Sequence, residues 1–200
     1  MLYALDDKGK KIRATPEAQA ICPECLAPVI AKCGVINIWH WAHRRRANCD
    51  IWGEHETKWH LDWKSRFPAE CVEVLIERDG SRHRADIYTP RGLVIELQHS
   101  ALSPEEIAER EAFYRNMLWV FDVSEPYDED RLDFRNKGQY HTFRWKMPRK
   151  HISCVRQGTA HLDTGDGRLF KMMAIHIESP CGGWGYFGRR DDFIRQHSRQ

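Results

Sequence analysis

The sequence predicts an α/β fold preceded by a small metal-binding unit. Three observations support this prediction: strand-like apolar segments between residues 71 and 123, helix patterns among them, and cysteines and histidines grouped between residues 22 and 49. A chain of 200 residues is long enough for one ordinary domain with a metal-stabilised addition. We therefore expect a zinc-finger-like unit over 1–50, an α/β core over 51–125, and a β-rich extension over 126–200 that packs on the core.

Composition limits the classes of protein to consider. The apolar share of 42% and the charged share of 30% are ordinary for a globular chain, and no apolar run approaches the roughly 20 residues that cross a bilayer. The N-terminus has no apolar signal core, so we expect a cytoplasmic protein with no membrane partner. A net charge of +2 neither demands nor excludes a polyanionic partner, because binding depends on where the charges lie.

Residue spacing predicts the elements of the core. After a short lead-in over 1–20 and the cysteine region, a helix is expected over about 54–66, because Trp59 and Trp63 lie four residues apart. A second helix should start at Ser103, which begins a Ser-x-x-Glu capping box, and run to about residue 116. The expected strands are 71–78, 82–89, 93–98 and 118–123, with a hairpin turn at Asp79-Gly80.

The hairpin between the second and third strands decides which side chains share a face. If Pro90-Arg91-Gly92 is a three-residue loop, Thr89 pairs with Leu93 and Asp86 lies opposite Glu96. A two-residue loop would put the two acids on opposite faces, but it would also split the apolar residues between both faces. Two facing carboxylates repel each other unless a cation or a proton lies between them, and a hard divalent ion such as Mg²⁺ or Mn²⁺ suits that place.

An ordinary pair of solvated surface acids is the alternative interpretation of these carboxylates. The strand that carries Glu96 is almost continuously apolar, which predicts that Glu96 is partly buried. A buried acid needs a partner, so the sequence favours the metal site.

The spacing of Asp86 and Glu96-Leu97-Gln98 resembles the Asp, spacer, Glu-x-Lys signature of the PD-(D/E)XK nuclease superfamily. That superfamily has a restriction-endonuclease-like core of helix, three-strand meander, helix and strand. A closer resemblance is to competence protein CoiA-like nucleases, which combine such a core with an N-terminal CxxC and a His-aromatic-x-His segment. Here these segments read CPEC and HWAH, and the likeness spans about residues 20–123.

The resemblance implies a metal-dependent nuclease, with DNA as the expected substrate. Asp86, Glu96 and the Leu97 carbonyl would hold Mg²⁺ or Mn²⁺, and Glu56 would supply a further oxygen from the first helix. Gln98 stands where the superfamily has Lys, and it would orient the attacking water without contributing charge. A catalytically weak or inactive nucleic-acid-binding module of the same fold is therefore the alternative, and a zinc-stabilised protein-interaction domain is a third possibility.

Several basic residues lie close in sequence to these acids and could contact phosphates. A charge run often marks only a solvated face, and Arg110 is equally compatible with a helical ion pair to Glu106 or Glu111. The candidate nucleic-acid contacts are Lys64, Arg44, Arg45, Arg84 and Arg110.

The grouped cysteines and histidines predict a structural zinc site. Seven cysteines without an export signal argue against a disulfide scaffold. A hairpin of strands over 27–32 and 35–40 would bring the second ligand pair back to the first. The CoiA-like pattern implies zinc ligation by Cys22, Cys25, His40 and His43; Cys33 and Cys49 compete with His40, and Cys49 is the main alternative.

Aromatic and basic residues alternate in the C-terminal part of the chain. Tyr140, Phe143 and Trp145 are followed by the glycine-rich segment 182–188. Such mixtures can stack bases and hold phosphates, but aromatic strand residues more often form a core, which we favour here. We interpret Asp163–Gly167 as a hairpin turn.

Overall fold

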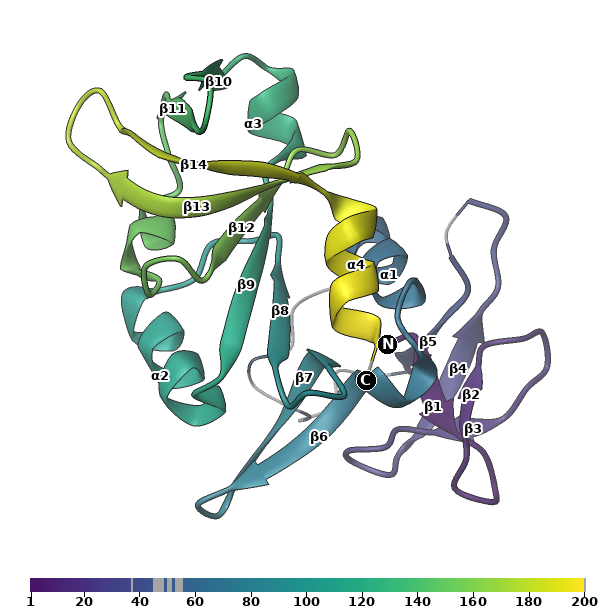
Figure 1. Ribbon diagram of the computed structural model, residues 1–200. Coiled ribbons are helices and arrows are strands. Elements are labelled where there is room, and N and C mark those ends of the chain that lie inside the picture. The colour runs from purple at the N-terminus through teal and green to yellow at the C-terminus, as the bar shows by residue number, and fades with distance from the viewer. Residues whose placement is uncertain (37, 45–48, 50–51, 53–55, 200) are drawn as a thin grey trace. The chain divides into compact units, whose positions relative to one another are not determined.

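The computed structural model describes residues 1–36, 38–44, 49, 52 and 56–199, which form two compact units, Met1–Pro90 and Arg91–Gln200 (Figure 1). The boundary falls at the predicted loop Pro90-Arg91-Gly92, whereas the sequence predicted parts over 1–50, 51–125 and 126–200. The predicted pairing of Asp86 with Glu96 would join the two units and stays a prediction.

The first unit begins with an antiparallel sheet in the order β2-β1-β3-β4-β5. Residues 1–20 are therefore part of the sheet, which the sequence interpretation missed when it treated them as a lead-in. The strands are β1 (Tyr3–Leu5), β2 (Lys11–Arg13), β3 (Ala20–Ile21), β4 (Pro28–Lys32) and β5 (His40–His43).

The predicted strand over 35–40 is wrong in position. β5 begins only at His40, which pairs with Lys32 of β4. Val35 and Ile36 are 102% and 80% exposed, while Trp41 is fully buried. Burial of the large indole of Trp41 contributes more free energy than burial of Val35 and Ile36 would. The strand therefore forms around Trp41, later in the sequence than predicted.

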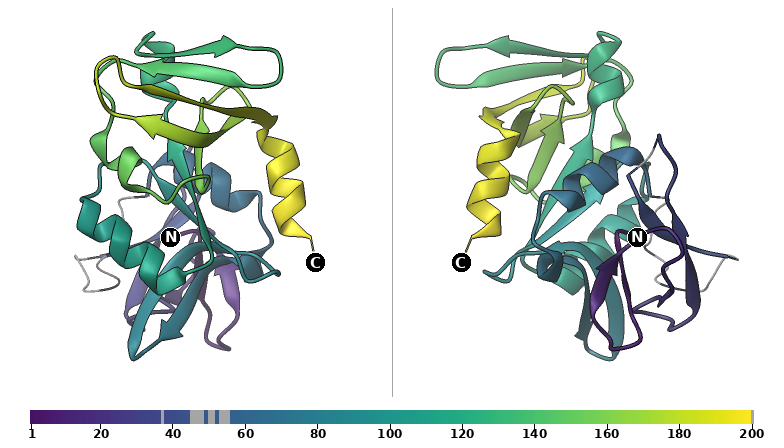
Figure 2. Two further views of the ribbon diagram at one scale, coloured as in Figure 1. Left: turned by 60° about the vertical axis from the view of Figure 1, so that its left-hand side comes forward. Right: turned by 90° about the vertical axis from the view of Figure 1, so that its right-hand side faces the viewer.

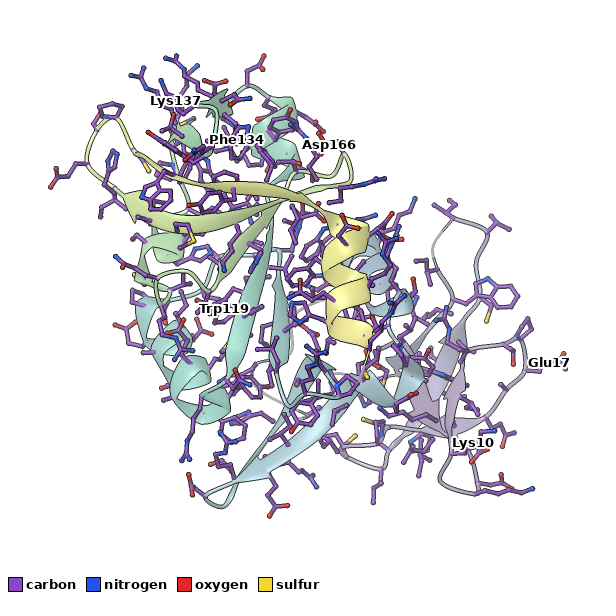
Figure 3. All side chains as sticks on the ribbon, viewed as in Figure 1. Lys10, Glu17, Trp119, Phe134, Lys137 and Asp166 are labelled. Atoms are coloured by element: carbon purple, nitrogen blue, oxygen red, sulfur yellow. The ribbon has the colours of Figure 1, made fainter. Side chains whose placement is uncertain are left out.

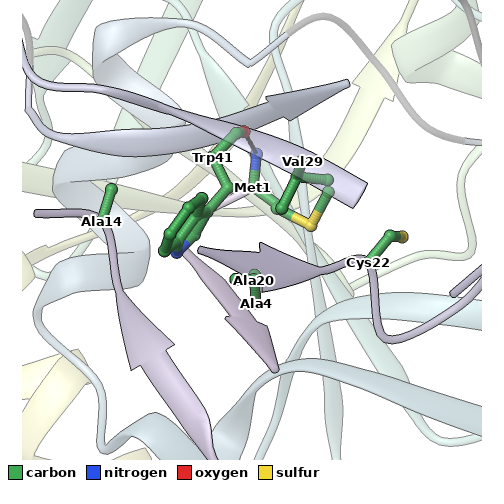
Figure 4. Packing of buried hydrophobic residues seen from close by; sticks show 7 residues of the cluster. All are labelled: Met1, Ala4, Ala14, Ala20, Cys22, Val29 and Trp41. Atoms are coloured by element: carbon green, nitrogen blue, oxygen red, sulfur yellow. Dashed lines mark hydrogen bonds between the residues drawn. The ribbon is translucent and has the colours of Figure 1, made fainter. Parts of the chain in front are cut away.

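Trp41 is the centre of the core of this sheet. Its indole Nε1 donates to the Ile12 carbonyl at 3.0 Å, and its own carbonyl accepts a hydrogen bond from the Met1 amino group at 3.0 Å (Figure 4). The buried residues drawn there are Met1, Ala4, Ala14, Ala20, Cys22, Val29 and Trp41.

The rest of the first unit contains α1 (Lys58–Ser65), a 3-10 turn η1 (Ala69–Cys71) and the hairpin of β6 (Val72–Arg78) and β7 (Ser81–Tyr88). Thr57 caps α1 by accepting a hydrogen bond from His60 N at 3.3 Å. Asp79 and Gly80 both have positive φ, as a two-residue hairpin turn of type I′ requires, so the predicted turn is confirmed.

The second unit contains the strands in the order β10-β11-β14-β13-β12-β9-β8. β8 and β9 are parallel, and α2 connects them, with Ser103 and Glu106 forming the predicted capping box. The first elements of this unit are β8 (Val94–Gln98), α2 (Pro104–Tyr114), β9 (Met117–Asp122) and α3 (Ser124–Asp128).

The C-terminal region is β-rich as predicted, but it does not form a separate layer packed on the core. β12 pairs in parallel with β9, so the later strands continue the same sheet. The turn at Asp163–Gly167 joins β12 to β13, and α4 continues directly from β14 (Figure 2). The elements are β10 (Leu132–Asn136), β11 (His141–Trp145), η2 (Lys150–Cys154), β12 (Ala160–Asp163), β13 (Arg168–His176), β14 (Gly182–Arg189) and α4 (Arg190–Ser198).

Four phenylalanines form an aromatic core on one face of this sheet. The ring of Phe134, labelled in Figure 3, lies 4.7 Å from Phe170, 4.8 Å from Phe187 and 6.1 Å from Phe143 between centroids. The expectation of a core role is thus confirmed for Phe143. Among the described residues, no helix has both the length and the apolar character needed to span a membrane.

Candidate metal centre and acid cluster

The first unit brings four soft ligands together. Cys22 and Cys25 lie in the tight turn between β3 and β4, where Leu26 N donates to the Cys22 carbonyl at 3.0 Å and Cys22 N donates to the Ala27 carbonyl at 2.8 Å. His43 ends β5, which pairs with β4 and so returns to the turn. The ligand atoms of Cys22, Cys25, His43 and Cys49 all lie within 4.8 Å of one another.

The spacing of these atoms suits one tetrahedral ion. The Sγ atoms of Cys22 and Cys49 are 3.7 Å apart, and His43 Nε2 lies 3.3 Å from Cys25 Sγ and 3.5 Å from Cys49 Sγ. Zn–S bonds of about 2.3 Å in a tetrahedron place two sulfurs about 3.8 Å apart. The cluster could therefore hold a metal such as zinc.

The structure brings Cys22, Cys25 and His43 together as the sequence predicted, and Cys49 completes the set. His40, which the CoiA-like pattern favoured, is not in the cluster, and its Nδ1 lies 2.9 Å from the Ile38 carbonyl. Burial and the nearby Arg84 guanidinium lower the pKa of His43, which favours the neutral imidazole that binds metal ions.

A second cluster in the same unit surrounds a buried lysine. The ammonium of Lys64, on α1, lies 2.6 Å from Glu56 Oε1, 2.8 Å from Asp86 Oδ1 and 3.3 Å from Glu73 Oε1. The Lys64 side chain is 2% exposed, whereas those of Glu56 and Asp86 are 17% and 21% exposed. We refer to Glu56, Lys64, Glu73 and Asp86 as the acid cluster.

Glu73 is the member of the acid cluster that the sequence interpretation missed. Its carboxylate is buried and accepts hydrogen bonds from Leu2 N at 2.8 Å and Tyr3 N at 3.0 Å. In the β6–β7 hairpin, Val72 pairs with Ile87 and Val74 pairs with Ala85, so Glu73 lies across from Asp86. A strand acid flanked by two valines was the available signal, because an acid at such a position is expected to be buried with a partner.

The charges of the acid cluster stabilise one another. Burial alone would lower the pKa of Lys64, but Asp86, Glu56 and Glu73 raise it well above its ordinary value. Burial alone would raise the pKa of Glu56, but the Lys64 ammonium and the N-terminal ammonium lower it to about 2. The lysine is therefore a fixed cation and Glu56 a fixed anion at neutral pH.

Arg84 lies between the two clusters on β7. Its guanidinium is 3.6 Å from Glu24 Oε2, and Glu24 lies within the CxxC turn. Burial opposes its charge, but Glu73, Glu56, Glu24 and Asp86 raise the pKa of Arg84. The predicted phosphate contacts at Arg84 and Lys64 are thus partnered with acids of their own unit.

In the second unit, the predicted acid Glu96 is buried, and its partner is Arg110. Arg110 Nη1 lies 3.2 Å from Glu96 Oε2, and both side chains are about 5% exposed or less. Arg110 is therefore buried beside Glu96 and is not an exposed side chain. Gln98 is also buried, and its Nε2 donates to the Ser100 carbonyl at 2.9 Å. Leu97 lies between Glu96 and Gln98 on β8.

Of the remaining candidate contacts, Arg44 is exposed just after β5. Arg45 lies outside the described residues.

Comparison with known families bears on the first unit. Residues 6–52 match the family model for the N-terminal domain of competence protein CoiA. The match includes β2 to β5 and all four residues of the soft-ligand cluster, and it supports the CoiA-like resemblance. No curated protein and no solved structure matched the chain.

Proposed function

We propose that this CoiA-like chain is a metal-dependent nuclease that hydrolyses phosphodiester bonds of DNA. The observation that carries the proposal is the contact of the Lys64 ammonium with Asp86, beside Glu56 and Glu73. The nuclease signature needs a cation next to its carboxylates, and Gln98 cannot supply that charge. Lys64 supplies it from α1.

The acid cluster also offers suitable donors for Mg²⁺ or Mn²⁺. Such ions bind hard oxygen ligands, and Glu56 Oε2 is a buried carboxylate oxygen with no hydrogen-bond partner within the described part of the chain. Glu56 and Asp86 would hold the ion, which when bound lowers the pKa of a coordinated water and offsets charge on the phosphate. Glu96 and the Leu97 carbonyl, in the second unit, remain the further ligands that the resemblance implies.

Lys64 has a positioning role in this proposal. Its three N–H donors match three carboxylates, which fixes the orientation of Glu56 and Asp86. Because the pKa of Lys64 is raised well above its ordinary value, it does not act as the base that takes a proton from water. Orienting that water is the predicted role of Gln98.

A nucleic-acid-binding module without turnover is the second candidate. It is favoured by the same contact, because the Lys64 ammonium already balances part of the negative charge that would attract a divalent ion. In that case the acid cluster would only hold α1 against the β6–β7 hairpin.

Cleavage assays with end-labelled single- and double-stranded DNA separate the two candidates. Wild type should cleave only with added Mg²⁺ or Mn²⁺, and Asp86→Asn and Glu56→Gln should each slow cleavage by about 100-fold or more. Asp62→Asn is the matched control, because Asp62 is a partly exposed acid on the same helix as Lys64, where its carboxylate lies 3.2 Å from Arg66 Nε. Binding without metal-dependent cleavage of either form would favour the second candidate.

A further inference from the structure

The sheet of the second unit has two chemically different faces around β14. Side chains alternate along a strand, so Phe187 points to the aromatic core while Trp184 and Tyr186 point to the opposite face. Trp184 and Tyr186 are 38% and 44% exposed. Large aromatic side chains are thus held at the surface by a sheet whose other face already has a core.

A third ring extends this exposed row. Tyr140, just before β11, is 40% exposed, and its ring centroid is 5.9 Å from that of Trp184. The Trp184 centroid is in turn 5.7 Å from that of Tyr186. Both pairs meet edge to face at 78°, so the three rings form a continuous but uneven aromatic strip.

Basic side chains surround the strip on the same face. Lys171 of β13 pairs with Tyr186, and Thr142 of β11 pairs with both Trp184 and Arg135. Residues that pair directly share a face of the sheet, which places Lys171 beside Tyr186 and Arg135 on the same face, two strands from Trp184. Asp133 is an acid on this face, and its carboxylate lies 3.3 Å from Arg135 Nε.

A hollow of about 350 Å³ lies at the β10–β11 side of the strip. Its lining includes three cationic side chains, Arg135, Lys137 and Arg144, together with His176. All four are exposed. We call Tyr140, Trp184 and Tyr186 together with Arg135, Lys137, Arg144 and Lys171 the aromatic–basic face.

Glycines in β14 leave room where this strand closely approaches its neighbours, so the strand can carry both the aromatic–basic face and the aromatic core. A Cβ on Gly185, between Trp184 and Tyr186, would lie 2.1 Å from the Lys171 carbonyl oxygen and 2.8 Å from the Phe170 ring. Gly182 leaves room at the hollow, where a Cβ would lie 2.4 Å from the Phe143 carbonyl oxygen. The glycine-rich sequence therefore lets β14 present its rings outward.

We propose that the aromatic–basic face binds single-stranded nucleic acid. Exposed rings stack on bases without sequence preference, and arginine and lysine beside them neutralise phosphates, so the face matches both parts of a single strand. A duplex hides the flat faces of its bases and would engage only the cations. The proposal concerns binding by the second unit and holds whether or not the acid cluster cleaves.

Fluorescence anisotropy tests this proposal with the full chain, a labelled oligothymidylate and no added divalent ion. Trp184→Ala should weaken binding by about 5- to 100-fold, and Trp184→Phe should keep most of the affinity because it keeps a stacking ring. Arg144→Ala should lower the slope of log affinity against log salt by about one unit, which Trp184→Ala should not do. An oligouridylate and a duplex of equal length show whether RNA binds equally and whether single strands are preferred.

Trp39→Ala is the matched control, because Trp39 is a 42% exposed tryptophan in the first unit. It should leave affinity unchanged. The proposal is overturned if Trp184→Ala binds like wild type or if Trp184→Phe loses as much affinity as Trp184→Ala. It is also overturned if the duplex binds as tightly as the single strand and binds every variant with the same affinity.

Discussion

The choice between Cys49 and His40 shows how a single residue defines the candidate metal centre. Spacing alone identified Cys22, Cys25 and His43, because CxxC and the end of a paired strand are local features. The fourth ligand depends on where β5 begins. Since β5 starts at His40, the backbone of this strand sets the direction of the His40 side chain. Cys49, which follows β5 in the sequence, has its Sγ among the other ligand atoms instead.

Two substitutions distinguish these ligands. Cys49→Ser should lower zinc retention after dialysis, and His40→Gln should leave about one zinc per chain, because only Cys49 Sγ lies with the other ligand atoms. Metal analysis of the purified variants measures this. Loss of zinc from His40→Gln with retention in Cys49→Ser would show that the ligand set is the one implied by the CoiA-like pattern.

Glu73 provides a second prediction at the residue scale. Glu73→Gln removes a charge that accepts two backbone N–H groups and contacts Lys64, so it should destabilise folding by about 2 kcal/mol. Glu77→Gln, at the exposed end of the same strand next to the hairpin turn, should change stability by about 0.5 kcal/mol or less. Urea unfolding of both variants makes the comparison, and equal stabilities would contradict the role given to Glu73.

His161 makes stability depend on pH. Burial, together with Lys171, lowers its pKa to about 4. Below the unfolded pKa of about 6.5, His161 binds a proton in the unfolded chain but stays neutral in the folded chain. The free energy of unfolding therefore decreases as the pH is lowered from about 6.5 to about 4, by up to about 1.4 kcal/mol per pH unit. His161→Phe should reduce the loss of stability between about pH 7 and about pH 5, as measured by urea unfolding. An unchanged loss in the variant would mean that other groups cause it.

At the scale of elements, local signals located α2 and the β6–β7 hairpin well. A capping box and an Asp-Gly turn act within a few residues, so their sequence patterns are sufficient. The strands β1 to β3 are only two or three residues long and carry no readable alternation. Their pairing is determined by the burial of Trp41 and by contacts between distant residues, which no local pattern contains.

The glycines of β14 give a prediction for one element. Gly185→Ala should strongly lower the melting temperature, because its Cβ would meet the Lys171 carbonyl oxygen at 2.1 Å, within a paired strand. Gly188→Ala should be tolerated, since the nearest atom to its Cβ is 3.9 Å away. Thermal unfolding followed by circular dichroism compares them, and a tolerated Gly185→Ala would contradict the close approach of β13 and β14.

At the scale of the whole molecule, the sequence indicated the α/β class but not the topology. β12 pairs in parallel with β9, although α3, β10, β11 and η2 lie between them in the sequence. This pairing makes the C-terminal strands part of one sheet. Nothing local in Ala160–Asp163 specifies that partner. The acid cluster has the same origin, since Lys64 meets Asp86 and Glu73 only after α1 and the β6–β7 hairpin have packed.

Metal-dependent cleavage is tested most directly by the rate at which circular single-stranded DNA is cut as the Mn²⁺ concentration is raised. Wild type should show a rate that rises and saturates with Mn²⁺, and Asp86→Asn should remain about 100-fold slower or more at every concentration while still retaining zinc. A wild-type rate that stays at the background of the Asp86→Asn variant over the whole range, with DNA binding intact, would contradict the nuclease proposal.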